Sequence, residues 1–206
     1  MEKKFKKIVQ GYQEFRDKYV HGDTSVMRSL SEVGQQPEVM VVACCDSRVD
    51  PALILQCDPG DLFVVRNVAN IVPPYEKDKG HHGTSAALEF GIRFLKIKHL
   101  ILLGHSQCSG INALMDSIKP HNASQHDFIT DWVSIIKTSS ADLTNVDDCA
   151  KSALKQSYEN CLSFPWIKDR LEEKQLIIHL WFFDIKMGQI YTYSEQQKAY
   201  VPLGVI

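Results

Sequence analysis

Two short segments of the sequence combine side chains that can bind a metal ion or act as nucleophiles. The first, CCDSR at 44–48, brings together two thiols, a carboxylate and a guanidinium, and the second, GHSQCSG at 104–110, adds an imidazole and another thiol. Thiolates and imidazoles are ligands that zinc prefers, so Cys44, His105 and Cys108 are candidate ligands of one zinc ion. Three protein ligands leave a fourth tetrahedral position for water, as in catalytic rather than structural zinc sites.

The same residues allow two other interpretations. A cysteine that ends a buried strand is commonly a small core residue, and an isolated His-x-x-Cys pattern arises easily by chance. Alternatively, CCDSR could hold a reactive thiolate that is activated by the guanidinium of Arg48. Arg48 follows the cysteines too closely, however, to complete the phosphate-cradling loop of a cysteine phosphatase. Spacing alone therefore leaves the metal site, the reactive thiol and the core cysteine open.

Both segments come directly after short apolar runs that are typical of buried β-strands. The runs 38–44 and 99–105 lead into them, and 61–68 and 175–184 are similar in character. Nearly continuous apolar residues, without alternation, indicate strands that are covered on both faces. In an open parallel sheet, ligands bind beyond the carboxyl ends of the strands. If the first and third runs are neighbouring strands, the three candidate zinc ligands can converge.

Helical patterns separate the apolar runs, which predicts an α/β fold with a mostly parallel central sheet flanked by helices. Residues 83–97 open with hydroxyl N-cap candidates and carry apolar side chains at helical spacing, and a further helix is expected over 109–118. Apolar residues three or four apart from Phe5 to Tyr19 indicate an amphipathic N-terminal helix. Gly188, between two β-rich runs, indicates a C-terminal hairpin.

Size and composition favour one globular domain that acts on a small molecule. With 206 residues, 44% of them hydrophobic, we expect a single domain over 1–206, with an N-terminal helical arm at 1–30 and an α/β core at 38–206. A formal charge of -2 gives no electrostatic footprint for nucleic acid or an anionic membrane. No signal peptide or long apolar segment is recognisable, so we expect a cytoplasmic protein with free or metal-bound thiols.

The two motifs also match a known family. CCDSR fits the C-x-D-S-R signature, and GHSQC the H-x-x-C signature, of the β-class carbonic anhydrases. The resemblance covers most of the chain, through QQPEVMVVACCDSRVDP, PGDLFVVRNVANIVPPYE, GTSAALEF and LKIKHLILLGHSQCSGI. It implies that Cys44, His105 and Cys108 bind one Zn²⁺ ion per subunit. It further implies reversible hydration of carbon dioxide to bicarbonate and a proton, by attack of a zinc-bound hydroxide.

The resemblance gives Asp46 and Arg48 catalytic roles. A carboxylate can accept a hydrogen bond from the zinc-bound hydroxide and orient it, while a bidentate guanidinium fixes that carboxylate and keeps it ionised. In some members the aspartate instead binds zinc and shuts the enzyme at lower pH; those members carry a tryptophan where this chain has Val41. The sequence is closer to the plant-type branch, whose site stays open. Cys45 should face away from the metal and pack, because successive strand residues point to opposite faces.

The resemblance also implies a carbon dioxide pocket and an oligomer. Plant-type members line the pocket with a glutamine, a phenylalanine and a valine, which Gln35, Phe63 and Val68 match. Two positions differ: Phe90 stands where a tyrosine is common, and Ser109 where a glycine commonly follows the last ligand. In the family, N-terminal helices embrace the neighbouring subunit and the site lies at the dimer interface. We therefore expect a homodimer or homotetramer.

Two other functions are compatible with these motifs. Hydrolases of carbon disulfide or carbonyl sulfide share the zinc ligands on the same scaffold and differ in access to the pocket. The second alternative is a non-enzymatic module that binds zinc or uses its thiols for binding. Such a module would have no need of Asp46 and Arg48, and both residues are present.

Overall fold

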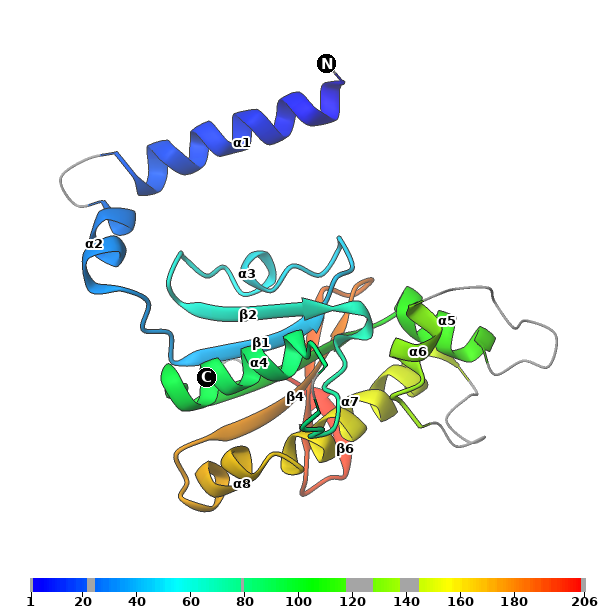
Figure 1. Cartoon of the computed structure of the whole chain (residues 1–206). Helices are drawn as coiled ribbons and strands as arrows, with labels where there is room; N and C mark the ends of the chain where they lie inside the picture. Colours follow the sequence, from blue (N-terminus) through cyan, green and yellow to red (C-terminus); the bar gives the residue numbers. More distant parts are fainter. Residues whose placement is uncertain (1, 22–24, 79, 118–127, 138–144, 205–206) are drawn as a thin grey trace.

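One six-stranded sheet organises the protein, with the strand order β2-β1-β3-β4-β5-β6 (Figure 1). The computed structural model describes residues 2–21, 25–78, 80–117, 128–137 and 145–204. The first four strands in this order run parallel, and the last two are antiparallel additions. The strands are Val39–Cys44 (β1), Leu62–Asn67 (β2), His99–His105 (β3), Ile177–Asp184 (β4), Gln189–Ser194 (β5) and Ala199–Pro202 (β6). The α/β fold with a mostly parallel sheet and a C-terminal hairpin is confirmed.

Helices connect the strands and surround the sheet. The described helices are Lys3–Tyr19 (α1), Val26–Val33 (α2), Pro51–Ile54 (α3), Gly83–Glu89 (α4), Ser109–Ser117 (α5), Ile129–Val133 (α6), Val146–Leu162 (α7) and Pro165–Glu172 (α8). Helix α7 packs on β3, where a Cβ atom on Gly104 would lie 2.8 Å from a methyl carbon of Leu154. The strand residues Leu100 and Leu102 are fully buried, as the continuous apolar pattern predicted. Residue 118, the expected end of the helix at 109–118, lies outside the described residues.

The single helix expected over 83–97 is divided in two. Helix α4 ends at Glu89 and is followed by a π-helical turn, Phe90–Phe94 (η2). At this turn Gly91 approaches β1 so closely that a Cβ atom there would lie 2.7 Å from Sδ of Met40. The wider turn also brings the rings of Phe90 and Phe94 together, with their centroids 5.6 Å apart. Helical spacing in the sequence does not distinguish a π-turn from a regular helix.

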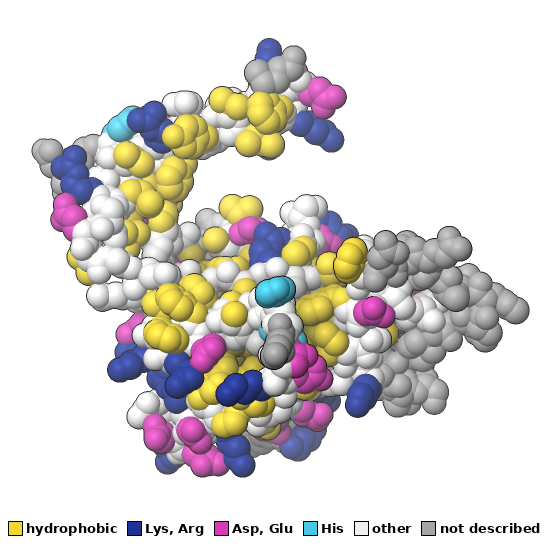
Figure 2. Space-filling model, in the orientation of Figure 1, with side chains coloured by type: hydrophobic (Ala, Val, Ile, Leu, Met, Phe, Trp, Pro, Cys, Tyr) yellow, Lys and Arg dark blue, Asp and Glu magenta, His cyan; other side chains and the backbone are white. Residues whose placement is uncertain are grey.

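The amphipathic N-terminal helix is confirmed, and it extends away from the sheet (Figure 1). None of its residues is buried, although its apolar side chains Phe5, Ile8 and Tyr12 share one side of the helix. Figure 2 shows hydrophobic side chains gathered along α1 and α2. Among the helices of the described residues, none has both the length and the apolar character that a membrane crossing requires.

Candidate metal centre

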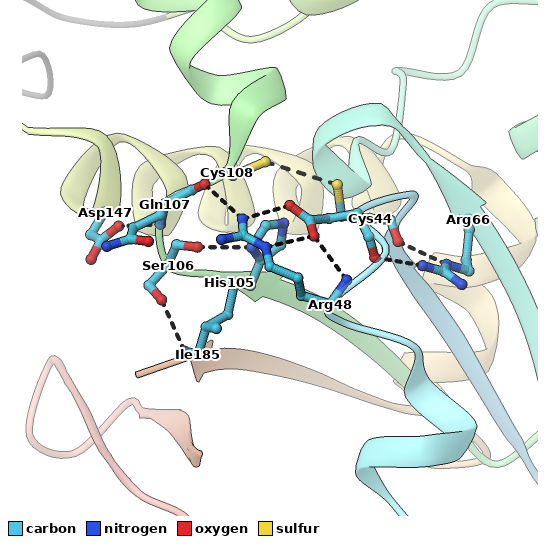
Figure 3. Close-up of polar contacts among 10 residues, drawn as sticks. Cys44, Arg48, Arg66, His105, Ser106, Gln107, Cys108, Asp147 and Ile185 are labelled. Carbon is cyan, nitrogen blue, oxygen red and sulfur yellow. Dashed lines mark hydrogen bonds and ion pairs between the residues drawn. The ribbon is translucent and has the colours of Figure 1, made fainter. Parts of the chain in front are cut away.

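Two parallel strands bring the candidate zinc ligands together. Cys44 is the last residue of β1 and His105 the last residue of β3, and these strands are direct neighbours in the sheet. Cys108 follows in the short turn that leads into α5 (Figure 3). One ligand atom from each residue lies within 4.8 Å of the other two, and all three side chains are buried. The convergence expected at the carboxyl edge of the sheet is present.

The tautomer of His105 is fixed by its backbone neighbour. Its Nδ1 atom lies 2.9 Å from the carbonyl oxygen of Ser106, which can only accept a hydrogen bond, so Nδ1 carries the proton. The Nε2 atom therefore presents a lone pair. It is buried and has no hydrogen-bond partner among the described residues. A buried polar atom without a partner is costly, and a metal ion would satisfy it.

The two cysteine sulfurs lie 3.9 Å apart. Their shared hydrogen bond lowers the pKa of Cys44 to about 4, whereas the same contact together with burial raises the pKa of Cys108. The contact thus favours the thiolate form of Cys44 over that of Cys108. A divalent cation would compensate a second negative charge and allow both residues to bind as thiolates.

Asp46 and Arg48 form a bidentate ion pair beside these ligands. Arg48 Nε donates to Asp46 Oδ1 at 2.9 Å, and Arg48 Nη2 donates to Asp46 Oδ2 at 2.8 Å. The backbone N–H of Arg48 adds a third bond to Asp46 Oδ1, at 3.0 Å. The adjacent guanidinium holds the pKa of Asp46 well below its usual range, so the carboxyl group is ionised. Asp46 is therefore engaged by Arg48 and does not belong to the ligand cluster.

A cavity of about 500 Å³ opens over the ligand cluster. It is lined by Cys44, Cys45, Asp46, Ser47, Arg48, Val68, Gln107, Ser109 and Gly110. Two of the expected substrate-pocket residues, Val68 and Ser109, thus share this space with the metal ligand Cys44. The expectation that Cys45 packs is wrong: its side chain is exposed and lines the cavity, because the strand ends at Cys44 and the chain then turns.

Comparison with known proteins decides the family. The family model described as "Carbonic anhydrase" matches residues 39–190. The chain belongs to this family. Two relatives from Arabidopsis thaliana place it in the beta class. Beta carbonic anhydrase 3 is 36% identical over 193 residues, which cover 88% of this chain and 74% of that protein. The chloroplastic beta carbonic anhydrase 5 is 35% identical over 185 residues, covering 85% of this chain and 60% of that protein.

Solved structures of beta carbonic anhydrases share the fold. The enzyme CcaA superimposes with a TM-score of 0.82 at 29% identity, covering 97% of this chain and 99% of that one. A tetrameric enzyme from Sordaria macrospora gives a TM-score of 0.74 at 26% identity, covering 93% of this chain and 97% of that one. As a carbonic anhydrase, the protein is a lyase.

Beta carbonic anhydrases are zinc enzymes, and the site fits that ion. Two sulfurs, each about 2.3 Å from a tetrahedral zinc ion, would lie about 3.8 Å apart. The separation of 3.9 Å between the sulfurs of Cys44 and Cys108 agrees with this value. The buried lone pair of His105 supplies a third donor. Zinc is therefore the cofactor that these three residues would hold.

Three of the expected pocket residues lie outside the cavity of this carbonic anhydrase. Gln35 is exposed in the segment before β1, whereas Phe63 belongs to β2 and Phe90 to η2. The rings of Phe63 and Phe90 contact each other, with centroids 5.8 Å apart. None of the three lines the space above the ligand cluster within one chain.

Arg66 supports the backbone of the first motif, and sequence reasoning missed it. Its Nε atom donates to the carbonyl oxygen of Cys44 and its Nη2 atom to that of Asp46, both at 2.8 Å. Its Nη1 atom donates to Asp50 Oδ2, also at 2.8 Å. One guanidinium from β2 thus holds the backbone of the first motif on both sides of Cys45 (Figure 3). The available signal was an arginine within a largely apolar strand.

The second motif is fixed by Ser106 and Gln107. Ser106 donates its N–H to the carbonyl of Phe183, and its hydroxyl oxygen accepts from the N–H of Ile185 at 2.9 Å. Gln107 adopts a left-handed backbone with φ of 55° and donates its N–H to Asp147 Oδ1 at 2.7 Å. These bonds connect the turn to α7, to β4 and to the residue after β4. They thus fix the backbone between the two candidate ligands, His105 and Cys108.

Proposed function

We propose that this beta carbonic anhydrase catalyses the reversible hydration of carbon dioxide to bicarbonate and a proton. The observation that carries the proposal is the convergence of Cys44, His105 and Cys108 within 4.8 Å, directly beside the ionised Asp46–Arg48 pair. An open cavity of about 500 Å³ gives a small neutral substrate access to this site. Membership of the family supports the same reaction.

Each side chain has a separate role in the proposed reaction. Zinc, when bound, supplies the Lewis acidity that makes water a nucleophile near neutral pH. Asp46 accepts a hydrogen bond from the attacking water and so directs its lone pair toward the substrate carbon. Arg48 holds both carboxylate oxygens, so Asp46 stays ionised and keeps its orientation. Val68 provides an apolar wall for carbon dioxide, and the hydroxyl of Ser109 offers a hydrogen bond to a bicarbonate oxygen.

We further propose that the active unit is at least a homodimer of this single domain. Phe90 is 42% exposed and Phe94 is 68% exposed, which leaves an aromatic surface beside Phe63 uncovered in one chain. We assign Gln35, Phe63 and Phe90 to the pocket at the interface, where a second copy would cover them. One structural neighbour is described as tetrameric.

The cytoplasmic location stays a prediction, since one relative is described as chloroplastic.

Stopped-flow carbon dioxide hydration, with zinc content measured on the same samples, tests this function. We expect the wild-type enzyme to contain one zinc ion per subunit, to hydrate carbon dioxide, and to lose activity when a chelator removes the metal. Cys44→Ser should lose both zinc and activity. Cys57→Ser is a matched control, because the thiol of Cys57 donates to the nearby carbonyl of Leu55 and does not line the metal-site cavity, so the change should alter neither quantity.

Two outcomes would contradict the proposal. A folded wild-type protein that binds no zinc would remove the metal from the reaction. A zinc-loaded protein that turns over carbonyl sulfide or carbon disulfide but not carbon dioxide would instead identify the sulfur-substrate hydrolase predicted as an alternative.

A further inference from the structure

A second cavity lies at the opposite edge of the sheet from the metal centre. It has a volume of about 480 Å³ and is lined by Lys96, Lys98, His99, Arg170, Lys174, Gln175 and Ile177. His99 is the first residue of β3 and Ile177 the first residue of β4, whereas His105 is the last residue of β3. A strand of this length spans about 20 Å, so the cavity is separate from the metal centre.

The lining of this cavity is strongly cationic. Four of its seven residues are lysine or arginine and none is acidic, although the chain as a whole has a formal charge of -2. Lys98 is ion-paired with Glu38, so its charge is already compensated. Lys96 and Lys174 make no salt bridge with any residue that the structure describes, and both side chains are exposed. At least two ammonium groups are therefore available to an anion.

Arg170 is held in a fixed orientation at this cavity. Its Nη1 atom donates to the carbonyl of Ile92 at 2.7 Å, and its Nη2 atom donates to the carbonyl of Gln175 at 3.0 Å. Its Nε atom is buried and has no hydrogen-bond partner in the described part of the chain. The guanidinium is thus anchored by uncharged carbonyls, which leave its positive charge uncompensated and one donor unsatisfied.

His99 adds an imidazole to the same lining. One of its ring nitrogens, Nδ1, lies 3.1 Å from Nε2 of His179 on the adjacent strand. When His179 donates in this bond, the Nε2 atom of His99 carries the proton and can donate to a ligand. The cavity then offers donors from two loops, one between η2 and β3 and the other between α8 and β4.

We propose that this cavity binds a small organic phosphate that carries two phosphate groups. Lysine ammonium groups commonly recognise phosphate, and the fixed positive charge of Arg170 beside them adds to the attraction for an anion. The lysines stand on two separate loops, and Arg170 lies in the last turn of α8 beside them, which suits two anionic groups joined by a short carbon skeleton. The volume lies within the range of small-molecule sites, which is roughly 300–1,000 Å³. This site does not depend on the carbonic anhydrase reaction proposed above.

Isothermal titration calorimetry on the zinc-loaded full-length protein tests the proposal. Fructose 1,6-bisphosphate is the probe, and fructose is the uncharged comparison, both at about 0.15 M salt to screen non-specific attraction. We expect the bisphosphate to bind and fructose not to bind. The double variant Lys96→Gln/Lys174→Gln should weaken bisphosphate binding about tenfold or more, because two charged contacts are removed. Glutamine is polar and only one bond shorter than lysine, and both positions are exposed, so folding should be unaffected.

The matched control is Lys77→Gln/Lys186→Gln, which removes the same charge from two exposed lysines outside the cavity. It should leave the affinity unchanged. Three results would overturn the proposal: no binding by the wild type, equal weakening in both double variants, or full binding retained by Lys96→Gln/Lys174→Gln. In the last case, competitive inhibition of carbon dioxide hydration would locate the probe at the metal centre.

Discussion

At the scale of single residues, two arginines bind different parts of the first motif, CCDSR at 44–48. Arg48 binds the carboxylate of Asp46, while Arg66 binds the backbone carbonyls on either side of Cys45. The first contact controls the charge and direction of the carboxylate, and the second controls the path of the chain that carries Cys44. Because Arg48 and Arg66 make different contacts, we expect substitution of one to affect the site differently from substitution of the other.

Arg66→Lys should lower kcat/KM for carbon dioxide hydration while zinc remains bound. Lysine keeps the positive charge but cannot donate in three fixed directions, so the backbone at Cys44 and Asp46 loses its common anchor. Loss of such a supporting contact around a metal site typically costs about 10- to 100-fold. Stopped-flow kinetics and zinc content on the same preparation measure both quantities.

Arg93→Lys is the matched control for this change, because Arg93 is an exposed residue of η2 whose guanidinium pairs with Glu89. The kcat/KM of Arg93→Lys should stay within about twofold of the wild-type value, because an exposed ion pair contributes little to stability. If Arg66→Lys behaves like this control, the guanidinium does not position the motif.

Side chains that bind metal were predictable from the sequence, whereas the residues that support them were not. Cys44, His105 and Cys108 could be assigned because their two motifs match the family signatures, whereas ligand type and spacing alone left other uses open. Arg66 and Ser106 act through backbone carbonyls and N–H groups, which every residue possesses, so no pattern marks them. Gln35 and Phe63 were expected in the pocket, yet one chain does not bring them to it.

At the scale of elements, the strands were predictable from their apolar runs, but only β1 and β3 are almost fully buried; β2, at the edge of the sheet, is half-buried and not covered on both faces as expected. The run 99–105 coincides with β3, and 61–68 exceeds β2 by one residue at each end. Short elements such as α3 and α6 were not foreseen, since four or five residues carry too little periodicity. The π-turn after α4 was missed because it depends on the close approach of Gly91 to Met40 of β1.

The start of α5 provides a test of how tightly the elements around the cavity are packed. A Cβ atom on Gly110 would lie 2.6 Å from Cγ1 of Val68 and 3.1 Å from the backbone nitrogen of Ala69. Gly110→Ala should therefore lower the free energy of unfolding by about 1–3 kcal/mol, as overpacking does elsewhere. Urea unfolding followed by circular dichroism measures this difference.

Gly83→Ala, at the first residue of α4, is the matched control. No atom lies within 4 Å of a Cβ built on Gly83, so alanine should be neutral or should stabilise the fold by up to about 1 kcal/mol. An unchanged unfolding midpoint for Gly110→Ala would show that α5 and Val68 can move apart without cost. The wall of the metal-site cavity would then deform more easily than the close contacts of Gly110 with Val68 and Ala69 indicate.

At the scale of the whole molecule, the most prominent feature is a 17-residue helix that buries none of its side chains. Ile8 is 68% exposed and Tyr12 58% exposed, and Figure 2 shows that such apolar groups continue along the helix. Contiguous apolar surface of this kind marks interaction sites in soluble proteins. In the proposed homodimer, a second copy covers this side of α1 and the aromatic surface at Phe90.

Ile8→Asp should dissociate the homodimer without unfolding the sheet. An aspartate on the apolar side of α1 would bury an unpaired charge in the interface, which is costly, whereas α1 contributes no buried residue to its own chain. Sedimentation velocity should show the wild type as a dimer or larger and the variant as a monomer, with a dissociation constant at least about tenfold higher. The unfolding midpoint of the isolated chain should depend little on this residue. Carbon dioxide hydration should fall in proportion to the dimer lost, since we place Phe63 and Phe90 at the interface.

Gln10→Asp separates the effect of position from that of charge. Gln10 is exposed on the polar side of the same helix, where its side-chain nitrogen donates to Glu14 Oε1 at 3.0 Å. This variant adds a negative charge to α1 as Ile8→Asp does, but it should sediment and turn over like the wild type. If both variants remain assembled, the apolar side of α1 is not part of the interface, and another surface must hold the subunits together.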